Sequence, residues 1–341
     1  MIRIGIICPS EIAERRFLPA LEKNVNFKFA GIAVSSIEER FGNEEVDQIL
    51  VVSVLNEEKN KAERILSKYG GKLFDSYESI VCSDEIDAIY IPLPPGLHFY
   101  WAKKALVHGK HVLVEKPSTT NLEETKALVE LARTKSLALH ENYMFVFHKQ
   151  LCEIQRLILE GTIGDIRLIR IDFGFPRRDR NDFRYNKDLG GGALLDAGGY
   201  TLKLGHLLLG ETSRVVCSHL NYINEYEVDF YGSATMINKA GLTAQISFGM
   251  DNEYRCNLDI WGSKGTLFTD RILTAPFDFE PTLQIKNSGV IQTLKLPKDD
   301  AFLSSVQFFH DCIVNFKCRS KSYEQILKQS ELLDEFLRNL K

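Results

Sequence analysis

The sequence predicts two α/β domains: a doubly wound parallel sheet first, then a domain with a large open, mostly antiparallel sheet. Up to about residue 140, short apolar runs alternate with amphipathic segments, which is the βαβ pattern of a parallel sheet. From residue 166 onward, longer runs alternate apolar and polar residues between turn signals, which is typical of antiparallel strands. A length of 341 residues also favours two domains. We expect the domains at 1–122 and 123–341.

Each predicted element follows from a change in this patterning. In the first domain we expect strands at 4–7, 27–34, 88–91, 111–114 and 137–139, with helices at 99–108 and 122–134. In the second we expect strands at 166–173, 231–237, 241–248, 255–261 and 266–269, a helical stretch at 194–209, and closing helices at 302–316 and 323–340. The segment 37–58 is longer than an ordinary βα connection, so we expect an additional element there, at the edge of the first sheet.

Composition and charge favour a small-molecule ligand. The chain has 42 basic and 46 acidic residues, a formal net charge of -4 and no block of lysine or arginine, which does not favour nucleic acid or a membrane surface as partner. Its 7 cysteines lack C-x-x-C spacing, so they predict neither a metal site nor a disulfide framework. Because we see no signal peptide and no apolar run long enough to span a bilayer, we expect a cytoplasmic protein.

The loop after the first strand is a candidate phosphate-binding site. A dinucleotide-binding fold has G-x-G-x-x-G/A where its first strand leads into a helix, and this chain has Cys8-x-Ser10-x-x-Ala13. Cys8 and Ser10 are small, and a helix starting near Glu11 still offers its N-terminal N–H groups to an anion. Taken alone, such a stretch is more often a plain turn between a strand and a helix.

Lys116 and Tyr200 are candidates for acid–base chemistry. Lys116 follows the strand at 111–114 and so stands at the carboxyl edge of the sheet, where open α/β sheets bind ligands. Asp196 and Tyr200 share one helical face, after three consecutive glycines at 190–192. A lysine ammonium near a phenol favours loss of the phenol proton, which suits a proton donor to a carbonyl. Alone, Lys116 also fits a solvated strand end, and Tyr200 a half-buried helix position.

Several stretches, in this order along the chain, resemble the Gfo/Idh/MocA family of NAD(P)-dependent oxidoreductases. They are Cys8-x-Ser10-x-x-Ala13, IPLPPGLH at 91–98, GKHVLVEKP at 109–117, ENYMFVFH at 141–148 and GGGALLDAGGY at 190–200. The Glu-Lys-Pro and triple-glycine motifs together are specific, and the likeness covers nearly the whole chain. It implies a Rossmann fold in the first domain. It also implies a second domain whose open sheet forms subunit contacts, hence a homodimer or homotetramer.

The resemblance also implies roles for individual residues. The family's catalytic lysine matches Lys116, and its acid–base residue, a histidine or a tyrosine, matches Tyr200. The stretch FGFPRRDRNDFRY before the glycines resembles the C-3 ketoreductases of nucleotide-linked deoxysugars, and its arginines suit a diphosphate. The expected substrate-binding residues are Asp196, His98, Arg177, Arg178, Arg184 and Tyr143. His98 fits a helix start equally well, and the arginines, which include Arg180, also fit a solvated loop.

NADP is the expected cofactor, with NAD as the alternative. The second strand ends in Ser35 and Ser36 without the acidic residue that would bind the ribose hydroxyls of NAD, and Arg40 follows, whereas Glu38 and Glu39 favour NAD. No metal is expected. The expected cofactor contacts are Cys8, Ser10, Glu11, Ile12, Ser35, Ser36, Arg40, Pro92, Leu93, Pro95, His98, Glu115, Lys116 and Asn142.

The expected activity is the reduction of a ketone on a nucleotide-linked sugar or deoxysugar. The nicotinamide supplies a hydride, Tyr200 a proton, and Lys116 stabilises the developing charge. A free-sugar or dihydrodiol dehydrogenase of the same family would use the same two residues without a need for the arginines. A non-catalytic NAD(P)-binding regulatory protein would keep the fold and the cofactor site alone.

Overall fold

The structure, a computed structural model that describes residues 1–42 and 46–341, divides into two compact units. Unit 1 comprises Met1–Thr119, Glu123–Asn142 and Ser305–Ile326, and unit 2 comprises Thr120–Leu122, Tyr143–Ser304 and Leu327–Lys341. Neither unit is one continuous stretch. The boundary expected at residue 122 stays a prediction about which part of the chain folds by itself. Expression of residues 1–122 alone would test it.

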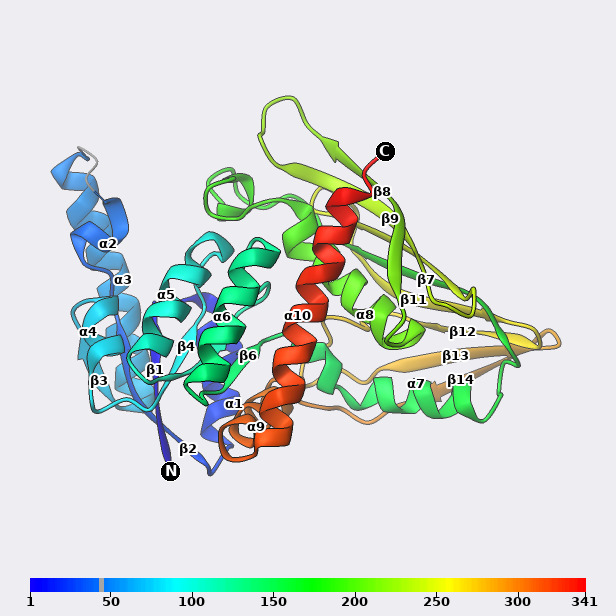
Figure 1. Cartoon of the computed structure of the whole chain (residues 1–341), viewed down its shortest axis with the longest axis horizontal. Helices are drawn as coiled ribbons and strands as arrows, with labels where there is room; N and C mark the ends of the chain where they lie inside the picture. The colour runs from blue at the N-terminus through cyan, green and yellow to red at the C-terminus, as the bar shows by residue number, and fades with distance from the viewer. Residues whose placement is uncertain (43–45) are drawn as a thin grey trace. The chain divides into compact units, whose positions relative to one another are not determined.

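Unit 1 contains a 6-stranded parallel sheet in the order β3-β2-β1-β4-β5-β6. In Figure 1 most of this unit is coloured blue to cyan. Its strands are β1 (Ile2–Ile7), β2 (Phe27–Ala33), β3 (Lys72–Phe74), β4 (Ala88–Ile91), β5 (His111–Val114) and β6 (Leu139–Glu141). All neighbouring strands run parallel, which confirms the predicted doubly wound sheet. The strand order reverses between β1 and β4, the place where open α/β sheets bind ligands. The predicted strand at 137–139 begins two residues later, and β3 was not predicted.

The helices of unit 1 include the additional element expected after β2. The segment 37–58 contains α2 (Ile37–Phe41) and the first half of α3 (Gln48–Tyr69), and residues 43–45 between them lie outside the described residues. Ser36 begins α2 with a capping box, and Asp47 caps α3. The helical elements are a π-helix (Ala13–Phe17), α1 (Leu18–Glu22), α2 (Ile37–Phe41), α3 (Gln48–Tyr69), α4 (Tyr77–Cys82), α5 (Pro95–Val107) and α6 (Leu122–Thr134). Two more, α9 (Ala301–Val314) and α10 (Phe316–Arg338), contribute residues to both units.

Unit 2 contains an 8-stranded sheet in the order β14-β13-β12-β11-β7-β10-β9-β8. Only the β7–β10 pair among these neighbours is parallel, so the predicted large, mostly antiparallel sheet is confirmed. The strands are β7 (Ile166–Gly174), β8 (Arg214–Tyr222), β9 (Asp229–Ile237), β10 (Thr243–Gly249), β11 (Arg255–Gly262), β12 (Gly265–Thr269), β13 (Thr282–Asn287) and β14 (Val290–Lys295). Of these, β8, β13 and β14 were not predicted.

Helices in unit 2 pack on this sheet and carry the candidate tyrosine. Gly205 of α8 (Gly199–Leu209) lies close to Met236 of β9, which lets the helix lie near the sheet. The predicted helix at 194–209 is a π-helical turn that continues into α8. The elements are a 3-10 helix (Met144–Phe147), α7 (Lys149–Leu159), a 3-10 turn (Phe183–Tyr185), the π-helix (Leu194–Gly198) and α8 (Gly199–Leu209).

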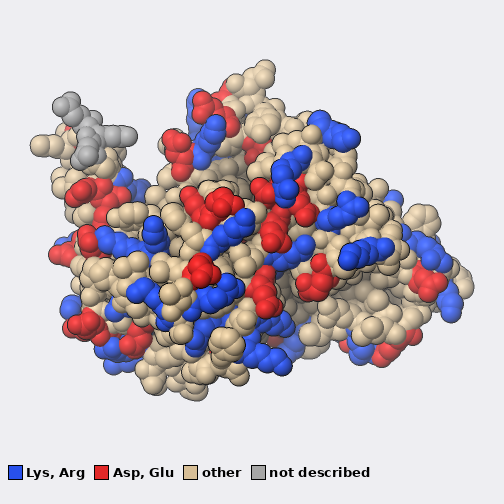
Figure 2. All heavy atoms as spheres, in the orientation of Figure 1, with Lys and Arg blue, Asp and Glu red and all other residues tan. Residues whose placement is uncertain are grey.

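The surface carries both signs of charge. On the face shown in Figure 2, Lys and Arg side chains are intermixed with Asp and Glu side chains rather than gathered into one basic patch. Within residues 1–42 and 46–341, no helix has both the length and the apolarity that a membrane crossing needs.

Candidate active site

The expected cofactor residues of unit 1 come from loops at one edge of the parallel sheet. Cys8 follows β1, Ser35 follows β2, Leu93 follows β4, Lys116 follows β5 and Asn142 follows β6. Because parallel strands all end at the same edge, these loops meet there. The structure therefore brings together residues that lie more than a hundred positions apart in the sequence.

The first loop keeps the backbone shape of a glycine-rich turn. Cys8 has a φ of 75°, in the left-handed region that favours glycine. Its carbonyl accepts a hydrogen bond from the N–H of Ser10 at 2.9 Å, and Ser10 Oγ accepts one from the N–H of Ala13 at 3.2 Å. The first N–H groups of a helix have no acceptor within the helix and can bind an anion. The loop therefore keeps a left-handed turn beside a helix N-terminus, and its role in binding a dinucleotide stays a prediction. Glu11 is exposed, and its Oε1 lies 3.5 Å from Nε of Arg15.

Glu58 of α3 is a buried carboxylate that the sequence analysis missed, and it contacts Ser35 just after β2. Glu58 of α3 accepts hydrogen bonds from the N–H of Ser35 at 3.2 Å, from the Tyr77 hydroxyl at 2.8 Å and from the Ser35 hydroxyl. Burial raises the pKa of Tyr77, so its hydroxyl stays protonated and donates. Both donors of Ser35 thus point to Glu58. No local pattern links Glu58 to Ser35, because the contact depends on how α3 packs.

The carboxylate of Glu39 is also taken up by hydrogen bonds within unit 1. Its carboxylate accepts hydrogen bonds from the backbone N–H groups of Ser36 at 2.8 Å and of Tyr77 and Glu78 at 2.9 Å. Arg40, by contrast, is exposed. The cofactor roles expected for Ser35, Ser36 and Arg40 stay predictions.

His98 is enclosed in unit 1. Its side chain is 0% exposed, and its ring nitrogens lie 2.7 Å from the carbonyl oxygens of Leu93 and of Pro117. Burial lowers the pKa of His98 to about 4, so the ring is neutral near pH 7 and donates one hydrogen bond. The imidazole thus lies between the loops after β4 and β5 and donates to one of them. Its expected contact with substrate and cofactor stays a prediction.

A buried polar network supports the loop that carries Lys116. Oε1 of Glu115 accepts hydrogen bonds from the Tyr90 hydroxyl and from Asn142 Nδ2, both at 2.7 Å. The hydroxyl of Ser305 on α9 donates to Asn142 Oδ1 at 2.8 Å. Burial raises the pKa of Glu115, although the two donors favour its charged form. Because Lys116 is the next residue, this network fixes the backbone from which its side chain extends.

In unit 2, aromatic rings hold the side chain of Tyr200. Tyr200 is 7% exposed, and its ring centroid lies 5.1 Å from that of Tyr143, 5.4 Å from that of Phe173 and 5.7 Å from that of Phe145. Edge-to-face packing of this kind fixes the orientation of a ring. Tyr143, expected to bind substrate, is therefore a direct packing neighbour of Tyr200.

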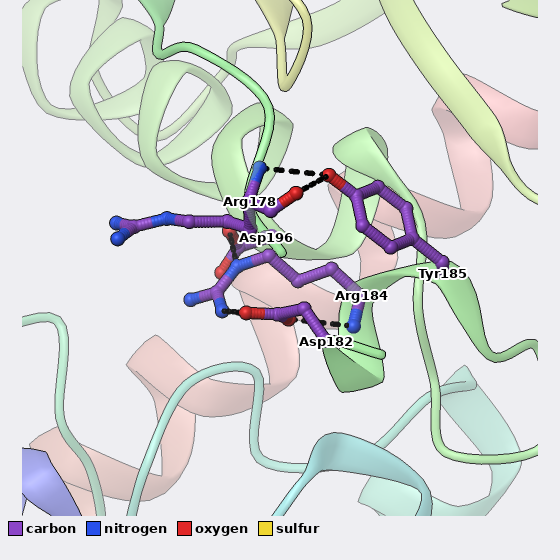
Figure 3. A network of polar contacts seen from close by, with 5 residues as sticks. All are labelled: Arg178, Asp182, Arg184, Tyr185 and Asp196. Atoms are coloured by element: carbon purple, nitrogen blue, oxygen red, sulfur yellow. Dashed lines mark hydrogen bonds and ion pairs between the residues drawn. The ribbon is translucent and has the colours of Figure 1, made fainter. Parts of the chain in front are cut away.

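The arginines of the loop before the glycines differ in their partners. Arg184 Nε donates to Asp196 Oδ2 at 2.6 Å and Nη1 to Asp182 Oδ1 at 3.1 Å, as Figure 3 shows. Burial lowers the pKa of Arg184, but the two carboxylates outweigh it and the pKa is raised. Arg177 forms an ion pair with Asp251 at 2.8 Å. The side chain of Arg178 points away from the network in Figure 3 and forms no ion pair with a described residue.

The fold of unit 1 is that of dinucleotide-binding proteins, and the family matches identify the class as oxidoreductases. Residues 4–143 match the model of an oxidoreductase family with an NAD-binding Rossmann fold, and residues 152–268 match the GFO/IDH/MocA C-terminal domain. The chain therefore belongs to the GFO/IDH/MocA oxidoreductase family, and the resemblance seen in its motifs is confirmed.

Within that family the chain is similar to deoxysugar reductases. It is 33% identical to the dTDP-3,4-didehydro-2,6-dideoxy-alpha-D-glucose 3-reductase of Actinomadura kijaniata, over 98% of this chain and 94% of the relative. The enzyme of the same name from Saccharopolyspora spinosa is 35% identical, over 90% and 86%. A crystal structure of a 3-ketoreductase from Actinomadura kijaniata with NADP and TDP-benzene superposes with a TM-score of 0.90 at 33% identity, covering 100% of this chain and 98% of that one.

Proposed function

We propose that this oxidoreductase reduces a ketone, at C-3, on a nucleotide-linked deoxysugar with NADPH. The observation that carries the proposal is the number of residues between a lysine and a tyrosine in the sequence. Crystal structures of the Actinomadura kijaniata 3-ketoreductase include variants in which one lysine is replaced by alanine or glutamate and one tyrosine by phenylalanine. Those two residues stand as far apart in that chain as Lys116 and Tyr200 stand in this one. This supports a shared pair of functional residues.

Each residue has a distinct role in the proposed reaction. NADPH supplies a hydride to the ketone carbon when it is bound. The Tyr200 hydroxyl donates a proton to the ketone oxygen, and the Lys116 ammonium stabilises the negative charge that develops on that oxygen. The ketone gains one hydride and one proton, so the products are a secondary alcohol and NADP⁺. Aromatic packing around Tyr200 supports this role because it orients the hydroxyl.

Turnover of a dTDP-linked 3-keto-deoxysugar, followed by NADPH absorbance, tests these roles. We expect Tyr200→Phe to lower kcat by about 10²-fold or more, because a positioned proton donor contributes that much. Lys116→Ala should lower it by roughly 10²-fold through loss of charge stabilisation. Tyr200→Phe should keep its affinity for NADPH. A fully active Tyr200→Phe enzyme would show that the proton comes from elsewhere.

The substrate class is tested through Arg178. We propose that Arg178, rather than the paired Arg177 and Arg184, meets the substrate diphosphate, because its guanidinium has no carboxylate partner in the described part of the chain. Arg178→Ala should raise KM for the nucleotide-linked substrate by about tenfold, as loss of one charged hydrogen bond implies. If the protein were instead a free-sugar or dihydrodiol dehydrogenase, the wild type and Arg178→Ala would turn over an unlinked substrate equally well.

Cofactor preference is tested by fluorescence titration with NADPH and, separately, NADH. We propose NADP because Arg40 is exposed, whereas the carboxylates of Glu39 and Glu58 are taken up by hydrogen bonds inside unit 1. Tighter binding of NADPH that Arg40→Ala abolishes supports this. Binding of cofactor without turnover of any keto-sugar would favour the non-catalytic regulatory protein.

We also propose a homodimer or homotetramer formed through the open sheet of unit 2. In this proposal the contact lies on the open face of the sheet. There Arg170 of β7 and Asp259 of β11, two neighbouring strands in the middle of the sheet, approach each other to 4.0 Å and supply polar groups for such a contact. Light scattering of the purified protein gives the number of subunits. A monomer at micromolar concentration would contradict the proposal.

A further inference from the structure

The helix that carries Asp196 and Tyr200 begins without a cap of its own. Ala193, the residue before the π-helix, makes no side-chain hydrogen bond to it. The first N–H groups of a helix have no acceptor within the helix, and unmet N–H groups in a buried place are costly. Here Leu194, the first residue of the helix, is buried. An acceptor for its N–H group is therefore needed from another part of the fold.

Asp229, the first residue of β9, supplies that acceptor. Its Oδ2 accepts a hydrogen bond from the N–H of Leu194 at 2.7 Å, and the residue is 9% exposed. Burial raises the pKa of Asp229 to about 6, so the carboxylate is charged at neutral pH. A negative charge at a helix N-terminus is stabilising. Asp229 thus acts as an N-cap supplied by a strand far away in the sequence.

Gly192 connects this cap to the arginine network. A Cβ at Gly192 would collide with Oδ1 of Asp229, and its φ of 110° also favours glycine. The N–H of Gly192 donates to the carbonyl of Arg184 at 2.9 Å, and its own carbonyl accepts from the N–H of Asp196 at 3.2 Å. Displacement of this turn would therefore move Arg184 and Asp196 together.

We propose that Asp229 is a positioning residue for the ketone-reducing site. It holds the start of the helix, and the helix in turn fixes Asp196 in its first turn and Tyr200 one turn later. This proposal rests on the proposed role of Tyr200. Asp229 acts through the helix and not by contact with substrate. Its loss therefore lowers turnover and leaves NADPH affinity unchanged, since the expected cofactor contacts belong to unit 1.

Paired substitutions at Asp229 provide the test. Asp229→Ala removes the acceptor and should lower kcat by about tenfold or more, because small displacements of a reacting group are costly. Asp229→Asn keeps an amide oxygen that accepts from Leu194 and should retain most of the rate. Gly192→Ala pushes against Asp229 from the other side and should resemble Asp229→Ala. The exposed Asp165, as Asp165→Ala, is the control, and NADPH titration of each variant shows whether unit 1 is intact.

Hydrogen–deuterium exchange at the Leu194 N–H measures whether Asp229 caps the helix, and it does so independently of catalysis. We expect faster exchange in Asp229→Ala than in the wild type or in Asp229→Asn. An unchanged kcat with slow exchange in Asp229→Ala overturns the proposal, as does an equal loss of rate in Asp229→Asn. If Tyr200→Phe proves fully active, the role of Tyr200 is wrong, and the exchange data then still decide whether Asp229 caps the helix.

Discussion

Cys8 shows how a single residue can occupy a position that favours glycine. Its φ of 75° is uncommon for a residue with a side chain, and burial raises the pKa of its thiol to about 12, so the thiol is protonated at neutral pH. The turn is therefore retained at a cost in backbone strain. The motif pattern alone left a plain turn as the more frequent explanation. The backbone at Cys8 has the left-handed conformation that favours glycine, and the phosphate-binding role of the loop stays a prediction.

Cys8→Gly should raise the free energy of unfolding by about 1 kcal/mol, because the left-handed strain is relieved and only part of the gain is lost to chain entropy. Urea denaturation measures it, and NADPH affinity should not fall. Ser136→Gly is the matched control for relief of backbone strain. Ser136 also has a positive φ, of 54°, but it does not lie at the carboxyl edge of the sheet. A less stable Cys8→Gly protein would mean that thiol packing outweighs strain.

Among the elements, α3 does more than lengthen the connection after β2. Through Glu58 it ties the end of β2 to Tyr77 at the start of α4. The unusual length of segment 37–58 predicted an additional element, but not this buried carboxylate. The reason is physical: a hydrogen bond between distant helices and strands leaves no periodic signal in the sequence.

Glu58→Ala should lower the free energy of unfolding by about 3 kcal/mol, since the N–H and hydroxyl of Ser35 and the Tyr77 hydroxyl would lose their acceptor in a buried place. Its neighbour Glu57, which pairs with Lys61 on the exposed side of α3, is the control. Glu57→Ala should have no measurable effect on the denaturation midpoint. Equal effects of the two substitutions would contradict a structural role for Glu58.

For the whole molecule, the sequence predicted the architecture of the two sheets better than the contacts between segments that are distant in the sequence. Hydrophobic periodicity located most strands and the order of the two sheets, because one face of each strand is buried. Motifs in family order located Lys116 and Tyr200. Neither signal could find Asp229 or Glu58, or show that Ser305–Ile326 belongs to unit 1, because these depend on contacts between segments distant in the sequence.

Stability should depend on pH through the histidines of unit 1. Burial lowers the pKa of both His98 and His111 to about 4 from 6.5, so between these values the unfolded chain binds more protons than the folded one. The contribution of these two histidines to the free energy of unfolding therefore rises with pH from about 4 to 6.5, and it is lost as the pH falls through that range. The full effect is on the order of 3 kcal/mol for each histidine. Asp229, whose pKa is raised, contributes in the opposite direction.

Denaturation curves at a series of pH values measure this dependence. His98→Gln should make the slope between pH 4 and 6.5 smaller by the contribution of one histidine, because His98 no longer titrates while His111 still does. His219→Gln, which changes an exposed histidine, should leave the slope unchanged. A His98→Gln protein with the wild-type slope would contradict the assignment.

The division of unit 1 into separate segments affects how the chain folds during synthesis. Ring packing between Phe27 of β2 and Phe309 of α9, with centroids 5.8 Å apart, joins one of the earliest strands to one of the last helices. Ribosomes add about 5–20 residues per second, so on the order of ten seconds pass between the emergence of β6 and that of α9. During that interval the nascent sheet carries an uncovered apolar surface around Phe27. We expect chaperones that hold unfinished chains to bind this surface before α9 emerges to cover it.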